Sequence, residues 1–166
     1  MEWVVGSVAL LTVAGLVHAL RMRPEPYCPV ECLSNLKNLA MAISMYVTDY
    51  DAPPDPRRWC DQTAEYIRSK EIYKCPEAPG LVCGYALNTG VKGASSGNMA
   101  TGATGAKTVT IFESDVGWNA HGGRELLPAE PRHLGGDNYG FLEGSARWMK
   151  REAAEGLLRW EVGGGG

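Results

Sequence analysis

The chain carries no excess of positive charge. Its 166 residues include 16 Lys and Arg against 19 Asp and Glu, which gives a formal net charge of −3 at pH 7. A basic surface is the electrostatic signature of nucleic-acid binding, so nucleic acid is not an expected partner. The chain also lacks H-E-x-x-H and a glycine-rich phosphate-binding loop. We therefore expect neither an enzyme nor a protein that needs a cofactor.

Phenylalanine is scarce as well, since only two Phe occur beside 21 Gly and 10 Pro. This composition is typical of a loop-rich domain that builds its core from Leu, Val, Ile, Tyr and Trp. About 140 residues lie outside the apolar start of the chain, which is enough for one compact domain and not for two.

One long hydrophobic run is present. Trp3 to Leu20 form 18 residues without a charged side chain, followed by Arg21 and Arg23. As a helix this run spans about 27 Å, close to the hydrocarbon thickness of a bilayer. It predicts a membrane anchor over residues 1–23, with membrane lipid as a partner. A cleaved signal peptide is the competing interpretation, although no basic stretch precedes the run and no small-x-small site follows it.

The segment after the anchor has the composition of a hinge, because three prolines between residues 24 and 29 interrupt any helix. The predicted divisions of the chain are the transmembrane anchor 1–23, the Pro-rich hinge 24–31, the head domain 32–162 and an unstructured glycine tail 163–166.

Two helices are predicted at the start of the head domain. From Cys32 to Tyr50, apolar residues recur at steps of three and four, which is the pattern of an amphipathic helix packed on the domain's own sheet. The expected inward positions are Leu33, Leu36, Ala40, Ile43, Val47 and Tyr50. Asp55 followed by Pro56 is an N-cap and first-turn pair, and it predicts a second helix that continues to about Ser69.

The rest of the head domain has β character. Short strands are predicted at 84–88, 108–112, 138–142 and 146–150. Residues 89–107 contain almost nothing to bury and predict a mobile loop. Glu143-Gly144 is expected to form a two-residue hairpin turn between the last two strands, where Gly supplies a positive φ. The predicted fold is therefore α+β, with helix packed on a small antiparallel sheet.

Five cysteines are present. Cys75 and Cys83 bracket CPEAPGLVC, where prolines and glycine fold the segment back and can bring the two thiols within bonding distance. A disulfide between them fits an oxidising compartment. Cys60 is a second candidate partner for Cys75, Cys28 and Cys32 lie near the membrane exit, and the odd count leaves at least one thiol free or paired between chains. Zinc is the rival interpretation, but no C-x-x-C occurs, so no metal is expected.

Several sequence blocks follow one another in a recognisable order. After the apolar N-terminal segment come CLSNLKNLAMAISMYVTDYD, EIYKCPEAPG, GYALN, TVTIFESD and RHLGGDNYGFLEGSARWMK. This order resembles the bacterial prepilin-type proteins, which carry an N-terminal cleavage and methylation segment and a C-terminal signature of His, nine residues and Asp-Gly. Here His133 is followed by nine residues and then Glu143-Gly144. The resemblance implies a pilin-like fold, with a stalk helix across a small sheet and a head outside the cytoplasm.

The resemblance also assigns subunit assembly to Glu2. In pilin-like filaments a glutamate near the start lies in the apolar bundle and meets the N-terminal amine of the neighbouring subunit. The alternative is an ordinary interfacial carboxylate at a helix start. The family's leader, ending in Gly and then Phe-Thr-Leu-Ile-Glu, does not precede Glu2, and the hinge prolines interrupt the long stalk helix. Either the numbering starts inside the processing motif, or the protein keeps its anchor without processing.

One group of polar residues invites a test for chemistry, and it comprises Glu113, Asp115, His121, His133, Asp137 and Glu143. Two histidines with carboxylates are compatible with a metal-dependent hydrolase. A calcium site is the other alternative, because secretion pseudopilins of similar build can bind calcium in their β region. We prefer structural roles, in which His133 bonds to backbone or to an acidic neighbour near the final hairpin.

These observations predict a membrane-anchored, non-catalytic pilin-like or pseudopilin-like structural subunit of a secretion or surface-filament system. Other pilin-like subunits are the expected protein partners, and the head is expected in the periplasm or at the cell surface. The alternative is an anchored extracytoplasmic binding protein that does not polymerise. Arg21 and Arg23, taken alone, place the head in the cytoplasm by the positive-inside rule, whereas the cysteines favour the outer side.

Overall fold

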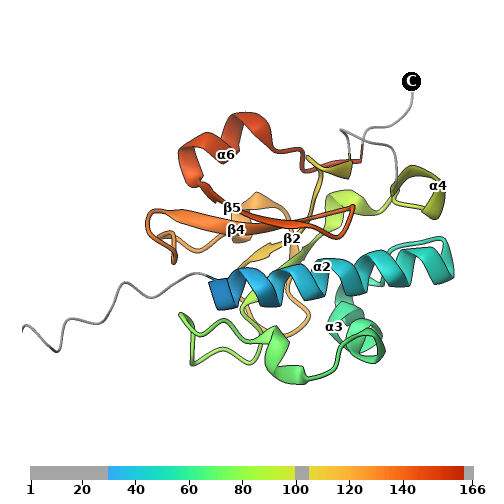
Figure 1. Cartoon of the computed structure of the whole chain (residues 1–166), viewed down its shortest axis with the longest axis horizontal. Helices are drawn as coiled ribbons and strands as arrows, with labels where there is room; N and C mark the ends of the chain where they lie inside the picture. Colours follow the sequence, from blue (N-terminus) through green and yellow to red (C-terminus); the bar gives the residue numbers. More distant parts are fainter. Residues whose placement is uncertain (1–29, 100–104, 163–166) are drawn as a thin grey trace, which may run out of the picture.

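A computed structural model describes residues 30–99 and 105–162 of the chain (Figure 1). These residues form an α+β domain in which one long helix lies along a five-stranded sheet. The predicted anchor, most of the predicted hinge, Glu2, Cys28 and the glycine tail lie outside the described residues. Within the described ranges, no helix is long and apolar enough to cross a membrane.

Helix α2 (Val30–Tyr50) confirms the predicted amphipathic helix. Its buried positions recur at steps of three and four and face the sheet, and they are Cys32, Leu36, Leu39, Ala40, Ala42, Ile43 and Val47. Two details of the prediction are wrong. The helix begins at Val30, so the last two residues assigned to the hinge are helical, and Tyr50 at its end is 57% exposed rather than inward.

The sheet has the strand order β3-β1-β2-β4-β5. Its strands are β1 Tyr85–Asn88, β2 Val109–Glu113, β3 His121–Gly122, β4 Gly136–Phe141 and β5 Ala146–Lys150. Three neighbouring pairs are antiparallel, but β3 runs parallel to β1. The sheet is therefore mixed, and the prediction of a purely antiparallel sheet is wrong. Strand β3 has only two residues, too few for an alternating pattern to be visible in the sequence.

The second predicted helix is broken into three short pieces. Asp55 caps its start as predicted, because its carboxylate accepts a hydrogen bond from Arg57 N at 2.9 Å. The pieces are η1 Pro56–Arg58, α3 Trp59–Thr63 and η2 Ala64–Tyr66. Helical structure stops before Ser69 because Ile67 adopts an extended conformation, with φ −117° and ψ 149°.

The segment 89–107, predicted as a loop, contains short helices where it is described. These are η4 Thr89–Val91 and α4 Ser96–Met99. The start of α4 is held by Asp51, whose carboxylate accepts hydrogen bonds from Ser96 N at 2.9 Å and Ser96 Oγ at 2.6 Å. The polar residues of this segment thus order the chain locally instead of leaving it without structure.

The connection from β4 to β5 is longer than the predicted two-residue turn, because Phe141 and Ser145 pair and leave three residues, 142–144, in the loop. Phe141 N donates to Ser145 O, and Gly144 N donates to Phe141 O, each at 2.8 Å. Gly144 has φ 86°, the left-handed conformation that the prediction required of this glycine. A glycine in this conformation is common in three-residue hairpin loops.

The core occupies both faces of the sheet. Because side chains alternate along a strand, Tyr85 and Leu87 pack toward α2, whereas Ala86 between them packs on the opposite side. The cluster on the α2 side contains four buried cysteines. The other cluster is covered by α6 (Arg151–Leu157) and by Trp160. Figure 1 shows α2 and α6 on opposite sides of the strands.

Candidate functional site

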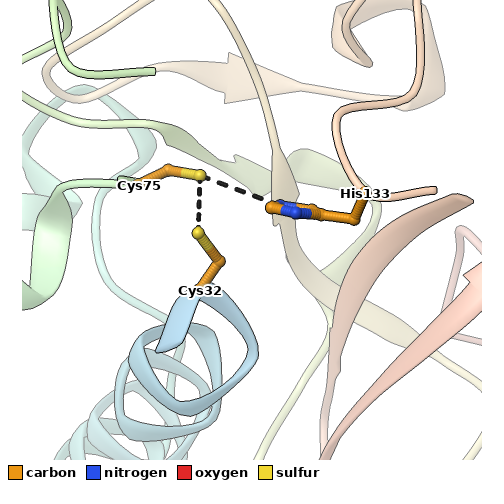
Figure 2. Close-up of side chains that lie close together, drawn as sticks. All are labelled: Cys32, Cys75 and His133. Atoms are coloured by element: carbon orange, nitrogen blue, oxygen red, sulfur yellow. Dashed lines mark hydrogen bonds between the residues drawn. The ribbon is translucent and has the colours of Figure 1, made fainter. Parts of the chain in front are cut away.

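Three reactive side chains from distant parts of the chain converge in the core beside α2 (Figure 2). Cys32 belongs to the first turn of α2, Cys75 follows the 3₁₀ helix η3 (Lys70–Tyr73), and His133 precedes β4. Cys75 Sγ lies 2.8 Å from Cys32 Sγ and 3.8 Å from His133 Nε2. Both cysteines are 0% exposed and His133 is 3% exposed, so the group is closed to solvent.

Hydrogen bonds from side chains to backbone carbonyls hold the segments of the two cysteines together. Asn35 Nδ2 donates to the carbonyl of the residue before Cys75 at 3.1 Å. The Tyr85 hydroxyl donates to the carbonyl of Cys32 at 3.3 Å. A Cβ atom at Gly84 would lie 2.8 Å from the Cys75 Cβ. The segment before β1 can therefore approach Cys75 this closely only with glycine at position 84. The start of α2 and the Cys75 segment are therefore fixed to each other independently of the thiols.

A two-residue turn sets the position of His133. Leu134 and Gly135 have φ values of 54° and 77°, and the backbones of His133 and Gly136 exchange hydrogen bonds of 3.2 and 3.0 Å. Positive φ at both central residues is the mark of a type I′ turn. Trp148 Nε1 donates to the carbonyl of His133 at 2.7 Å. The ring is thus aimed into the core by the turn that starts β4.

The imidazole of His133 has an acidic partner. Its Nε2 lies 2.5 Å from Glu113 Oε1, and the Glu113 carboxylate also accepts from Asn138 N at 3.1 Å and Asn138 Nδ2 at 2.9 Å. Burial by itself lowers the pKa of His133, but hydrogen bonds to Cys75 and Glu113 outweigh burial and raise the pKa to about 9. His133 is therefore protonated at neutral pH. The predicted acidic neighbour is confirmed, although it belongs to β2 and not to the final hairpin.

The first cysteine pair has one acidic and one weakly acidic thiol. The hydrogen bond between the sulfurs raises the pKa of Cys32, and burial raises it further. The same hydrogen bond lowers the pKa of Cys75, as does the contact with His133, against the opposing effect of burial. Because the contact with His133 is made by Cys75, these hydrogen bonds favour Cys75 as the thiolate of this pair.

A second pair of thiols lies in the same core cluster. Cys60 Sγ of α3 is 4.0 Å from Cys83 Sγ, which precedes β1, and both residues are 0% exposed. Cys60 Sγ accepts a hydrogen bond from Asn119 N at 3.3 Å, and Cys83 Sγ donates to Tyr85 O at 3.4 Å. Burial raises the pKa of the Cys60 thiol above its ordinary value. The four described cysteines thus form two facing pairs.

The four described cysteines are free thiols in the structure, and Cys75 contacts Cys32 instead of Cys83, its predicted partner, or Cys60, the alternative. The intervening segment does fold back, since Ala78 N donates to Cys75 O at 2.8 Å and Gly84 N donates to Tyr73 O at 2.9 Å. The two side chains, however, face different helices: Cys75 meets α2 and Cys83 meets α3. The sequence did contain a signal that Cys32 is buried in the core. Cys32 lies four residues before Leu36, on the buried stripe of α2.

The six polar residues proposed for chemistry do not form one site. Only Glu113 and His133 come together. Each of the others has its own nearby partner: Asp115 Oδ1 contacts Arg132 Nη2 at 2.5 Å, Asp137 accepts from Arg151 at 2.7 and 2.8 Å, His121 Nδ1 lies 2.9 Å from Asn119 O, and Glu143 Oε1 accepts from Ser145 Oγ at 2.7 Å. The carboxylates proposed for calcium therefore lie in three separate interactions.

The spacing between His133 and Glu143-Gly144 has a structural explanation. His133 lies just before β4 and Gly144 lies in the loop that follows it, so the nine intervening residues contain the whole strand. Glu143 itself is exposed and contacts only the neighbouring Ser145 among the interactions described. The two ends of the pattern are therefore turn positions on either side of β4, and only His133 reaches the buried cluster.

The cluster has an imperfect geometry for nucleophilic catalysis. In a catalytic relay the two nitrogens of the histidine contact different groups, one the nucleophile and the other the carboxylate. Here His133 Nε2 contacts both Cys75 and Glu113. The cysteines are also fully buried. The contacts instead describe a protonated imidazole held between a carboxylate and a sulfur.

The donor set of two thiols and one imidazole is also the kind that zinc uses, and these atoms lie within 4.8 Å of one another. Two thiolates on a tetrahedral zinc are about 3.8 Å apart, given a zinc–sulfur distance of about 2.3 Å. The sulfurs of Cys32 and Cys75 are 2.8 Å apart, and His133 Nε2 is occupied by Glu113. The arrangement therefore fits a sulfur–sulfur interaction better than a metal site.

Two surface grooves lie away from this cluster. One, of about 1020 Å³, is bordered by η4 and by residues 159–162. The other, of about 560 Å³, lies between η5 (Arg124–Leu126) and α6 and is lined partly by Tyr139, Arg151 and Trp160. None of the four cysteines and neither member of the Glu113–His133 pair lines them.

Comparison of the chain with protein-family models, with curated proteins and with solved structures gives no match.

Proposed function

We propose that the protein is a membrane-anchored, non-catalytic structural subunit of the pilin-like kind, with its head outside the cytoplasm. The observation that supports this best is the arrangement of α2. It is the first described element, it follows the apolar segment Trp3–Leu20 in the sequence, and it lies along the sheet with its apolar stripe buried. A head built around such a helix is suited to be held at a membrane and to pack through the helix's remaining face.

The outward face of α2 supports a role in subunit contacts. Met41 and Met45 lie one turn apart and are 46% and 50% exposed. Methionine side chains are flexible and polarizable, and they are common on surfaces that bind protein partners. Gly144 of the β4–β5 loop lies beside Met41, since a Cβ at Gly144 would be 3.4 Å from Met41 Cγ. The proposed contact surface therefore comprises Met41, Met45 and the adjoining loop at Gly144.

An anchored binding protein that does not polymerise is the second candidate. The groove between η5 and α6 favours it, because this groove combines aromatic side chains with Arg124 and Arg151. Most ligand sites combine apolar walls with a few polar groups in this way. Arg151 is already paired with the buried Asp137, however, which leaves Arg124 as the cation with no ion pair described.

The test combines fractionation with cross-linking. We expect the full chain to remain with membranes and a version without residues 1–29 to be soluble, because burial of 18 apolar residues strongly favours the bilayer. In membranes, cross-linking should yield multimers that M41E/M45E reduces at least several-fold. L157E is the matched control, because Leu157 is 56% exposed on α6, far from the proposed surface in the fold.

Each outcome has a clear meaning. Full chain in the soluble fraction without detergent contradicts the anchor. Membrane-bound protein whose cross-linking is absent, or is unchanged in M41E/M45E, contradicts the structural subunit and favours the anchored binding protein.

A further inference from the structure

We propose that the head domain carries two interleaved disulfides, Cys32–Cys75 and Cys60–Cys83. Along the chain these bonds join the first described cysteine to the third and the second to the fourth. This proposal shares one assumption with the proposed function, namely that the head domain lies in an oxidising compartment. It holds equally for a polymerising subunit and for a binding protein.

The pairing follows from the positions of the sulfurs. Four cysteines allow three pairings. In the structure Cys32 and Cys75 are 2.8 Å apart, and Cys60 and Cys83 are 4.0 Å apart. A disulfide bond has a length of about 2.05 Å, so the first pair needs less than 1 Å of approach and the second needs a small change in side-chain torsion. Each thiol already faces its partner.

The four cysteines converge from separate parts of the chain. All four cysteines are 0% exposed and belong to one core cluster, yet they arrive from α2, α3, the segment after η3 and the segment before β1. The two bonds would close loops that span residues 32–75 and 60–83. Each loop contains one end of the other, so together the bonds tie both helices to the segments that lead into the sheet.

The surroundings of the first pair favour sulfur–sulfur bonding over metal binding. His133 is the remaining member of the candidate zinc set, but its Nε2 lies 2.5 Å from Glu113 Oε1. The Glu113 carboxylate is in turn bonded twice by Asn138. Recruiting His133 as a ligand would break this buried network, whereas a disulfide leaves it intact.

The chemistry needs an external disulfide as oxidant, such as that of a thiol–disulfide oxidoreductase or of oxidised glutathione. The thiolate of either cysteine of a pair, for example Cys75, attacks one sulfur of that disulfide, and the other sulfur leaves as a thiolate. Cys32 then loses its proton and attacks the Cys75 sulfur, which releases the second sulfur of the oxidant as a thiolate. In total two thiols lose two protons and two electrons, and the oxidant becomes two thiols. Because the folded cysteines are buried, we place this exchange during folding.

The test uses the full chain in detergent, refolded either with reduced and oxidised glutathione or with a phosphine reductant. A C28S background removes the fifth cysteine, which could otherwise exchange with Cys32. Free thiols are alkylated at low pH, and disulfide-linked peptides are mapped without reduction. We expect complete protection of all four thiols from alkylation, and an intact mass lower by the four hydrogen atoms lost. The expected linked peptides are 32 with 75 and 60 with 83.

Variants make the pairing falsifiable. C32S/C75S should keep the Cys60–Cys83 link, and C60S/C83S should keep the Cys32–Cys75 link. C32S/C60S is the matched control, because it leaves Cys75 and Cys83 without their partners, and both should be alkylated. If a variant fails to fold, the map of the C28S protein alone decides.

Three results would overturn the proposal. They are linked peptides of Cys75 with Cys83, four alkylated thiols after refolding with oxidised glutathione, and stoichiometric zinc bound by the four reduced thiols in metal analysis. Because the oxidant is supplied in the buffer, none of these results depends on the membrane test. Failure of the pairing and failure of the proposed function are therefore distinguishable.

Discussion

Replacing His133 by glutamine should remove a pH-dependent part of the stability of this protein. In the folded state the pKa of His133 is raised from 6.5 to about 9, because the contacts with Cys75 and Glu113 outweigh burial. One pKa unit corresponds to about 1.4 kcal/mol, so protonation of His133 contributes on the order of 3 kcal/mol to folding. This contribution is a large share of the stability of an ordinary small domain.

The sign of the pH dependence follows from the direction of the shift. Between pH 6.5 and about 9 the folded protein holds a proton that the unfolded chain has released. The contribution is therefore complete below pH 6.5, declines as the pH rises and is lost above about pH 9. H133Q should lack this decline, and it should be the less stable protein at pH 6, because Glu113 would remain buried without its cation.

The assay is urea denaturation followed by tryptophan fluorescence at half-unit steps from pH 6 to pH 9.5. A phosphine reductant keeps Cys75 reduced, since the raised pKa of His133 depends on the contact with Cys75 as well as on the contact with Glu113. H121Q is the control, because His121 is exposed and lies outside the cluster. We expect wild type and H121Q to lose about 3 kcal/mol more than H133Q across this range. Equal pH slopes in wild type and H133Q would refute the assignment of the shift to His133.

Two further substitutions test the packing of the fold. G140A should destabilise by about 1 to 3 kcal/mol, because its Cβ would lie 2.5 Å from Ile111 Cγ2 and 3.0 Å from Ala40 Cβ, between β4 and α2. The control is G156A on α6, where no atom lies within 4 Å, and equal losses of melting temperature in both variants would contradict this explanation. R151A should cost about 3 kcal/mol, because it leaves the fully buried carboxylate of Asp137 without its ion pair. K150A is the neighbouring control, and a chemical denaturation midpoint for R151A as high as that of K150A would show that Asp137 does not need its partner.

Local patterns predicted the long helix well, and they failed where the chain depends on tertiary contacts. The three- and four-residue period between Cys32 and Val47 is a property of the sequence itself, so α2 was predicted nearly to its ends. Strand β3 could not be predicted, because its two residues form a strand only by pairing with β1. The early end of the second helix is likewise set by the extended Ile67, which no capping signal announced.

Residues of the candidate site could be named from the sequence, but which of them contact one another could not be predicted. Glu113 and His133 were both expected to matter, yet their meeting depends on the register of β2 against β4. That register places Phe112 opposite Tyr139 and so brings Glu113 next to Asn138 and into reach of His133. The cysteines illustrate the same limit. Spacing along the chain favoured Cys75 with Cys83, whereas the packing of two helices on one core decides which thiols meet.

The attachments at the start of α2 also have a mechanical meaning. Within its first six residues the helix offers the Cys32 sulfur to Cys75, the Cys32 carbonyl to Tyr85, and the Asn35 amide to the backbone before Cys75. A tensile load that enters the head through residues 1–29 would reach these contacts before any later turn of α2. Because the three contacts lie so close together, they share such a load, whereas a helix held only by its apolar face could separate from the sheet one turn at a time. The start of α2 is thereby attached to the rest of the domain at the point where such a load would enter.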